Sequence, residues 1–213
     1  MPVIAVDGPA ASGKGTIARA LAKHFGLPHM DTGLLYRAVA LNLWRWGGDP
    51  ANEFEALRAC ANLGFDPDDG ELRSEAVSEV ASRISAYSSV RSALLERQRA
   101  FAGQEGGGVL DGRDIGTVIA PDADVKLFVI ASPEVRAERR LKELEKRGMR
   151  AGYADVLADI HARDQRDSSR EAAPLKPAAD AILLDTSALS VDEAIAEAIR
   201  VAGERIRYGG DVG

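Results

Sequence analysis

The sequence has only one cysteine, no long hydrophobic run and no excess of positive charge. Each of these features excludes a class of protein. Cys60 is the only cysteine among 213 residues, so an internal disulfide is excluded and a reducing, cytoplasmic location is expected. No apolar run approaches the ~18 residues of a membrane span, and no signal-peptide pattern is apparent at the N-terminus. The net charge of −6 argues against general binding to nucleic acids. We therefore expect neither a membrane nor a nucleic acid as a partner.

Lysine is also scarce: the basic residues are 21 Arg and only 6 Lys. The planar fork of Arg binds phosphate in a bidentate manner, so a phosphate site is one explanation of the bias. A GC-rich genome is another, since it would also raise Ala and Gly, and both are abundant here. We favour the genomic explanation for the bias as a whole. It does not explain where particular arginines lie.

A glycine-rich loop near the N-terminus stands between a predicted buried strand, Val3–Val6, and a predicted helix. Glycines allow backbone N–H groups to turn toward phosphate oxygens, the helix N-terminus adds positive potential, and Lys14 can reach the β- and γ-phosphates. The order of strand, loop and helix therefore predicts a phosphate-binding loop. Its residues are Gly8, Pro9, Ala10, Ala11, Ser12, Gly13, Lys14, Gly15 and Thr16.

One position of this loop departs from the general pattern. The residue after the loop lysine is usually a Ser or Thr that holds Mg²⁺, whereas here it is Gly15, and Thr16 follows one place later. The order Gly-Lys-Gly-Thr resembles the loop of small nucleoside-monophosphate kinases more than that of switch GTPases. We take Thr16 as the candidate Mg²⁺ ligand, either directly or through a water molecule.

Predicted strands and helices alternate along the whole chain, which predicts an α/β fold with a five-stranded parallel sheet and helices on both faces. Ligands are expected beyond the carboxyl ends of the strands. The strands are predicted over residues 3–6, 27–30, 109–111, 125–130 and 181–184. The helices are predicted over residues 17–25, 34–46, 53–63, 75–86, 90–102, 133–147, 154–166 and 191–207. We interpret residues 65–73 as a small surface excursion.

Three polar clusters follow predicted strands or lie on predicted helices, and each mixes arginine with aspartate. They comprise residues 31–37, 111–117 and 163–170. A single cluster of this kind is best explained as a solvated, salt-bridged loop. Three of them near one phosphate loop favour a second anionic substrate.

These motifs together resemble bacterial cytidylate kinase. The resemblance rests on the glycine-rich loop, Asp31-Thr32-Gly33-Leu34-Leu35-Tyr36-Arg37, the segment 111–117, Ala137-Glu138-Arg139-Arg140 and the segment 163–170, in the order of that family. It implies a P-loop kinase that transfers the γ-phosphoryl group of ATP to CMP or dCMP, with Mg²⁺. It also implies the adenylate-kinase-like fold, and we expect one domain, residues 1–208, acting as a monomer.

The same resemblance implies two mobile parts beside the core. A nucleotide-binding insertion spans about residues 38–90, and a short lid spans about residues 147–154. Many family members carry a small β-sheet in the insertion, whereas this chain has only the stretch 65–73, so the insertion is reduced. Arg139 and Arg140, which enter the lid, would lie near ATP. Residues 209–213 are predicted to form a frayed tail.

Roles for the phosphate-binding residues follow from the resemblance. Lys14, Arg37, Arg113 and Arg170 would surround the acceptor phosphate, and Arg163 would lie near the transferred group. ATP and CMP together carry about −6 charge near neutral pH, of which Mg²⁺ offsets only part. A cage of cations is therefore needed, and catalysis is expected to consist of positioning and electrostatic stabilisation.

Roles for the nucleoside-binding residues follow in the same way. Thr32 and Asp167 would contact the ribose, with Thr32 at a position where the family often has Ser. Ser82, Arg91 and Asp114 would recognise the cytosine. Taken without the family pattern, Ser82 and Arg91 are simply positions on amphipathic helices.

The remaining reactive side chains are not assigned to catalysis. The acceptor phosphate is already mostly deprotonated, so no general base is required, and His24, His29 and His161 are interpreted as structural or surface groups. Cys60 is interpreted as a small buried residue rather than a nucleophile.

Two alternatives stay open. One is a related small-molecule kinase of the same fold that acts on UMP, AMP or a non-nucleotide acceptor. The other is a nucleotide-binding switch protein, although the sequence has neither the Asn-Lys-x-Asp motif that reads guanine nor an Asp-x-x-Gly loop.

Overall fold

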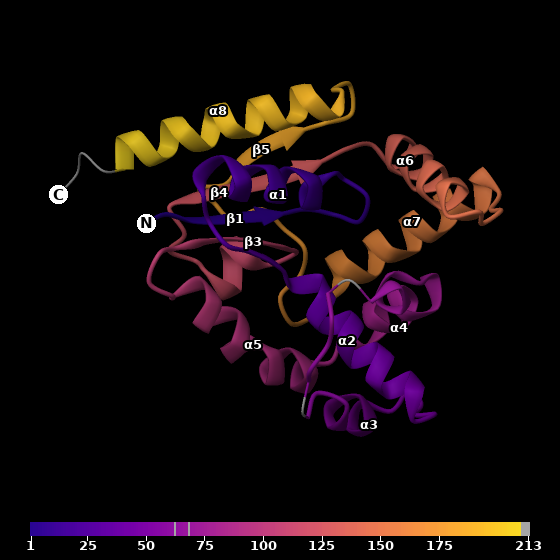
Figure 1. The fold of residues 1–213 in the computed structure, drawn as a ribbon. Helices are drawn as coiled ribbons and strands as arrows, with labels where there is room; N and C mark the ends of the chain where they lie inside the picture. The colour runs from indigo at the N-terminus through magenta and orange to yellow at the C-terminus, as the bar shows by residue number, and fades with distance from the viewer. Residues whose placement is uncertain (62, 68, 210–213) are drawn as a thin grey trace.

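A five-stranded parallel sheet forms the centre of the fold, with the strand order β2-β3-β1-β4-β5 (Figure 1). The computed structural model describes residues 1–61, 63–67 and 69–209. The strands are β1 (Val3–Asp7), β2 (His29–Asp31), β3 (Gly108–Gly112), β4 (Val125–Ile130) and β5 (Ile182–Asp185). The expected parallel sheet is confirmed. The second strand begins later than predicted, because Leu27 and Pro28 belong to the connection that enters it.

Helices cover both faces of this sheet because alternate side chains of the central strand point to opposite sides. Ile4 and Val6 pack with the helices α1 (Lys14–Phe25) and α8 (Val191–Gly209) in one apolar cluster. Ala5 packs on the other face with the short π-helix η2 (Ile115–Ile119) and with side chains of α5 (Ser88–Ala102). The last helix, α8, runs to Gly209, and residues 210–213 of the predicted tail lie outside the described residues.

A second apolar core lies away from the sheet, among the helices that follow β2. It joins α2 (Thr32–Arg45), α3 (Glu53–Arg58), the 3-10 turn η1 (Gly70–Arg73) and α4 (Glu75–Ile84), which lie below the sheet in Figure 1. The described residues between 63 and 74 contain η1 and no strand. These helices hold α4 beside α7 (Tyr153–Ser169), with the pocket described below bordered by both.

Two predictions in this region are wrong in detail. The helix predicted over residues 53–63 ends at Arg58, because the following amides bond three residues back, Cys60 to Leu57 and Ala61 to Arg58, and tighten into turns. The helix predicted over residues 34–46 ends at Arg45, and Trp46, which is 45% exposed, is its C-cap. The guanidinium of Arg58 lies 4.8 Å from the centroid of the Trp46 ring.

The helices α6 (Pro133–Lys146) and α7 are joined by a loop that contains most of the residues 147–154 of the expected lid. The predicted helix start is confirmed, since the Ser132 hydroxyl accepts a hydrogen bond from the Val135 N–H and Pro133 opens the helix. The helix stops before Gly148, whose φ of 74° is favourable for glycine. Among the residues that the structure describes, no helix is long and apolar enough to cross a membrane.

Candidate active site

The glycine-rich loop joins β1 to α1 at the carboxyl edge of the sheet. Gly8 and Gly13 both have positive φ, and a Cβ atom on Gly8 would lie only 2.1 Å from the carbonyl oxygen of Val129. Glycine is therefore required at position 8 by space as well as by conformation. Lys14 is the first residue of α1, and its ammonium donates to the carbonyl oxygen of Pro9 at 3.3 Å.

All the predicted acceptor-side residues line a single pocket in front of this loop. Seven strands and helices contribute to it: β2, β3, α1, α2, α4, α5 and α7, together with the segment after β3. Its predicted members are Lys14, Thr32, Arg37, Ser82, Arg91, Arg113, Asp114, Arg163, Asp167 and Arg170. Residues from position 14 to position 170 thus converge on one space.

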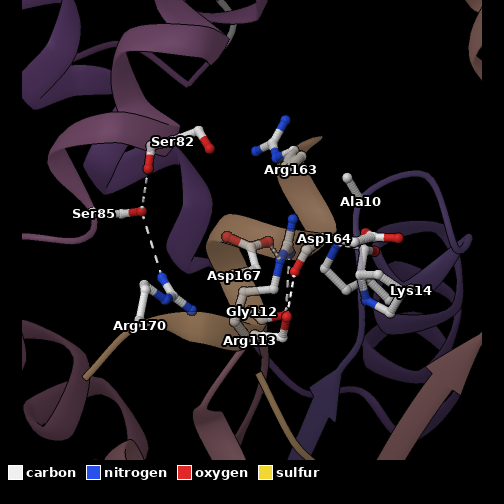
Figure 2. A network of polar contacts seen from close by, with 12 residues as sticks. Ala10, Lys14, Ser82, Ser85, Gly112, Arg113, Arg163, Asp164, Asp167 and Arg170 are labelled. Carbon is white, nitrogen blue, oxygen red and sulfur yellow. Dashed lines mark hydrogen bonds and ion pairs between the residues drawn. The ribbon is translucent and has the colours of Figure 1, made fainter. Parts of the chain in front are cut away.

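Two buried ion pairs organise the pocket. The Arg113 Nε donates to Asp167 Oδ2 at 2.8 Å, and Arg91 pairs with Asp114 at the other end. Burial, the largest single influence, raises the pKa of the Asp167 carboxyl, but Arg113, Arg163 and Arg170 together outweigh burial and lower that pKa. Figure 2 shows Arg113 and Asp167 between the loop that carries Lys14 and a line of contacts that joins Arg170, Ser85 and Ser82.

Two arginines of α7 and its end hold unused hydrogen-bond donors. The Arg163 Nη1 reaches Ser78 Oγ at 3.4 Å, and the Arg170 Nη1 reaches Ser85 Oγ at the same distance. The Arg163 Nε and the Arg170 Nε and Nη2 are buried without a partner among the described residues. Burial, with Arg113 nearby, lowers the pKa of Arg163 to about 9. Such donors are expected to receive an anion.

The pKa of Lys14 is lowered in the same way as that of Arg163. Burial is the main cause that lowers its pKa to about 7, with Arg113 adding to the effect and with Asp111 and Asp31 opposing it. Burial and the neighbouring Arg113 thus disfavour the charged forms of both Lys14 and Arg163. An incoming phosphate would relieve this.

A second pocket lies on the other side of the loop and is open toward α6 and α8. It is bordered by loop residues from Ala11 to Ile17, by Arg139 and Arg140, and by apolar residues of α8. Arg139 is fixed there, since it donates to the Thr186 hydroxyl at 2.9 Å and to the Thr186 carbonyl at 2.6 Å. The structure thus brings Arg139 and Arg140 beside the phosphate loop.

At the carboxyl edge of the sheet, the arginine-rich pocket also involves residues to which the sequence analysis assigns no role in binding or catalysis. Asp111 faces the pocket, and its Oδ1 lies 2.7 Å from the Nε2 of His29. The predicted ribose ligand Thr32 donates its hydroxyl to the Asp111 carbonyl at 2.8 Å. Asp111 belongs to the polar segment 111–117, and its place at the end of a predicted strand could have indicated a role at the site. His29 is structural, as interpreted, through this contact.

A further missed pair supports the loop from behind. Arg136 is 4% exposed and bonds both carboxylate oxygens of Asp164, while its Nη1 also donates to the Ala10 carbonyl at 3.3 Å. A sequence pattern does not distinguish Arg136 from its exposed neighbours, because the contact joins residues 126 positions apart.

Comparisons with known proteins agree with this arrangement. The family model described as cytidylate kinase matches residues 4–204. A cytidylate kinase of Methylocella silvestris is 58% identical over 198 residues, covering 92% of each chain. One of Xanthobacter autotrophicus is 57% identical, covering 95% of this chain and 98% of the relative. A solved structure of an uncharacterized protein from Eubacterium ventriosum shares the fold, with a TM-score of 0.56 at 16% identity over 95% of this chain and 98% of that one.

Proposed function

Because the chain belongs to the cytidylate kinase family, its reaction is the transfer of the γ-phosphoryl group of ATP to CMP, and we propose how its residues perform this step. The two pockets on either side of the phosphate loop divide the substrates. The pocket bordered by Arg139, Arg140 and α8 receives ATP, and the arginine-rich pocket receives CMP or dCMP. Lys14 lines both, so it stands between donor and acceptor.

The arginine-rich pocket neutralises the acceptor phosphate. Arg37, Arg113 and Arg170 surround that group, and Arg163 stabilises the phosphoryl group in transit. The unused donors of Arg163 and Arg170 support this assignment, because they are buried and lack a partner in the described part of the chain. Catalysis then needs no general base, since fixed cations supply the stabilisation.

The far end of the acceptor pocket recognises the nucleoside. Thr32 and Asp167 contact the ribose, and Ser82, Arg91 and Asp114 contact the cytosine. Cytosine presents an amino donor at position 4 where uracil presents a carbonyl, and an ionised carboxylate only accepts hydrogen bonds. The Asp114 carboxylate therefore favours cytosine. Its pairing with Arg91 at the pocket wall is the observation that carries this proposal.

The Mg²⁺ that accompanies ATP fits residues beside Gly15. A Cβ atom on Gly15 would lie 3.6 Å from Asp111 Oδ2, so the missing side chain leaves room next to a carboxylate. Carboxylate, hydroxyl and phosphate oxygens are the ligands that Mg²⁺ prefers, with several of its waters retained. The Thr16 hydroxyl and the Asp111 carboxylate would hold the ion, which when bound offsets part of the phosphate charge.

We also propose that the insertion, residues 38–90, and the lid, residues 147–154, close over the two substrates. An open site would allow water to accept the phosphoryl group. Negligible ATP hydrolysis without CMP is therefore expected, whereas hydrolysis as fast as transfer would favour a switch protein. The proposal includes a cytoplasmic location and a monomeric enzyme, the latter to be checked by sedimentation.

Steady-state kinetics with CMP, dCMP, UMP and AMP test the assignment of Asp114. Leaving a buried polar group unpaired costs ~1–3 kcal/mol, so UMP should be disfavoured roughly tenfold to a hundredfold. In Asp114→Asn, the amide can turn to donate to uracil. We expect kcat/KM for CMP to fall and the CMP/UMP ratio to narrow. An equal loss with both substrates would contradict base recognition by Asp114.

A further inference from the structure

Asp7 is a buried carboxylate that has no part in the reaction described above. It is the last residue of β1, directly before the phosphate loop, and is 5% exposed. Its Oδ1 accepts a hydrogen bond from the Ile115 N–H and its Oδ2 from the Gly116 N–H, both at 2.8 Å. Each carboxylate oxygen is thus committed to the backbone of a segment more than 100 positions away.

That segment is the start of the π-helix η2, and the two amides are its first. The opening N–H groups of a helix have no partner within the helix and need an outside acceptor. The usual acceptor is the side chain of the residue just before the helix, and aspartate is among the best residues for it. Here that residue is Asp114.

Asp114 does not cap its own helix. Its carbonyl oxygen accepts from the Val118 and Ile119 amides, as expected at this position, but its side chain makes no capping bond in the described structure. Its carboxylate instead faces the acceptor pocket and pairs with Arg91. A side chain at this position would accept from the second or third amide of the helix, and the second, that of Gly116, is bonded by Asp7 instead, together with the first, that of Ile115.

We propose that Asp7 is a positioning residue for substrate selection: it caps η2 in place of Asp114 and so leaves the Asp114 carboxylate free to recognise the acceptor base. This inference rests on the proposed role of Asp114. Because Asp7 directly precedes Gly8, the same contact ties the base-recognising segment to the beginning of the donor loop.

The start of η2 packs tightly against the neighbouring strands. A Cβ atom on Gly116 would lie 3.5 Å from Asp7 Oδ2 and 3.2 Å from the Cδ atom of Lys126, so the backbone of η2 is held closely against β1 and β4. When Asp7 no longer accepts the bond from Gly116, we expect the Asp114 carboxylate, at the position before the helix, to accept it instead. Turning toward that amide would withdraw it from the pocket.

Four variants test this inference: Asp7→Asn, Asp114→Asn, the double variant, and Asp124→Asn as a matched control. Asparagine at position 7 keeps the shape but accepts only one of the two bonds. Asp124 also accepts a backbone bond, from the Val3 N–H at 2.7 Å, but at the opposite end of β1. The CMP/UMP ratio of kcat/KM is measured for each, because this ratio is independent of the folded fraction.

For Asp7→Asn we expect kcat/KM for CMP to fall about tenfold, the size of a lost helix cap. The CMP/UMP ratio should narrow, and the KM for CMP should change more than the KM for ATP. In the Asp114→Asn background, the same substitution should leave the ratio unchanged, and Asp124→Asn should behave as the wild type.

The outcomes separate the two assignments. If Asp114→Asn leaves the ratio intact, base recognition by Asp114 is wrong, and the inference about Asp7 is wrong with it. If Asp114→Asn narrows the ratio while Asp7→Asn preserves it, only the positioning by Asp7 is overturned. The positioning role is also overturned if Asp7→Asn narrows the CMP/UMP ratio equally in the wild type and in the Asp114→Asn background. Asp7 would then act independently of Asp114.

Discussion

Arg140 on α6 forms an ion pair with Glu75, the first residue of α4, and thereby joins these two helices. Arg140 also bonds Glu143 at 2.5 Å, and Arg147 donates to the carbonyl oxygen of Arg73 at 2.8 Å. Both connections join α6 or its C-cap, Arg147, to residues 73–75. Arg140 is therefore engaged with carboxylates, although it borders the proposed ATP pocket.

Removing the charge of Glu75 should strengthen ATP binding. In Glu75→Gln, Arg140 no longer has to leave this partner to meet the phosphates. Glu75 is 45% exposed, and exposed pairs contribute ~0.2–1 kcal/mol, so the Kd for ATP should fall by about 1.4- to 5-fold. Titration calorimetry at low salt measures the change.

The control for this variant is Glu197→Gln, which breaks an ion pair with Arg200 on α8 and should leave ATP binding unchanged. An unchanged or weaker affinity in Glu75→Gln would show that Arg140 does not exchange Glu75 for ATP.

The parts of the fold that depend on local pattern could be predicted from the sequence. The apolar run before Gly8 and the periodic residues after Lys14 are adjacent along the chain, so strand, loop and helix follow from short-range rules. Ser132 and Pro133 define the start of α6 for the same reason. The convergence of the arginines on one pocket followed from the family resemblance, since spacing alone does not bring residue 37 beside residue 163.

Features that depend on distant partners could not be predicted. Nothing near Asp7 in the sequence indicates that it caps η2, and nothing near Arg136 indicates its contact with Ala10. The helix predicted over residues 154–166 extends to Ser169 because Asp167 is buried in its ion pair with Arg113, which no local pattern reports. Long-range hydrogen bonds therefore account for most of what the sequence leaves open at the site.

Asp7 should make the enzyme less stable as the pH rises from about 4 to about 6. Burial raises the pKa of its carboxyl to about 6, although the bonds from Gly116 and Ile115 oppose this. The folded state then binds the proton more tightly than the unfolded state, so ionisation above pH 6 costs on the order of 3 kcal/mol. Below the unfolded pKa of 3.8 this cost is absent.

Urea unfolding of the wild type and Asp7→Asn between pH 4.5 and 7 measures this cost. The difference in free energy of unfolding, variant minus wild type, should grow by about 2 kcal/mol or more over this range. Other carboxyl groups cancel in the difference. A difference independent of pH would mean that Asp7 is ionised throughout.

Cys60 should react slowly with alkylating reagents. It is half-buried, and burial raises the pKa of its thiol to about 11. An ordinary cysteine, with a pKa of ~8.5, is about one quarter thiolate at pH 8, whereas Cys60 would be about one thousandth, so iodoacetamide should react roughly 200-fold more slowly. The same protein in urea provides the control and should react at the ordinary rate. Rapid alkylation of the folded enzyme would contradict this environment.

Lys14 should take up a proton when ATP binds. With a pKa of about 7, lowered mainly by burial, it is largely neutral at pH 8 before ATP binds. The phosphates of ATP favour the charged ammonium and raise that pKa, so close to one proton should enter at pH 8 and much less at pH 6. Calorimetry at pH 8 with EDTA, in buffers of different ionisation enthalpy, measures the uptake directly. Lys23→Arg, in the last turn of α1, is the control and should retain it. Binding without proton uptake at pH 8 would show that Lys14 is already charged in the empty site, and that Asp111 and Asp31 outweigh its burial.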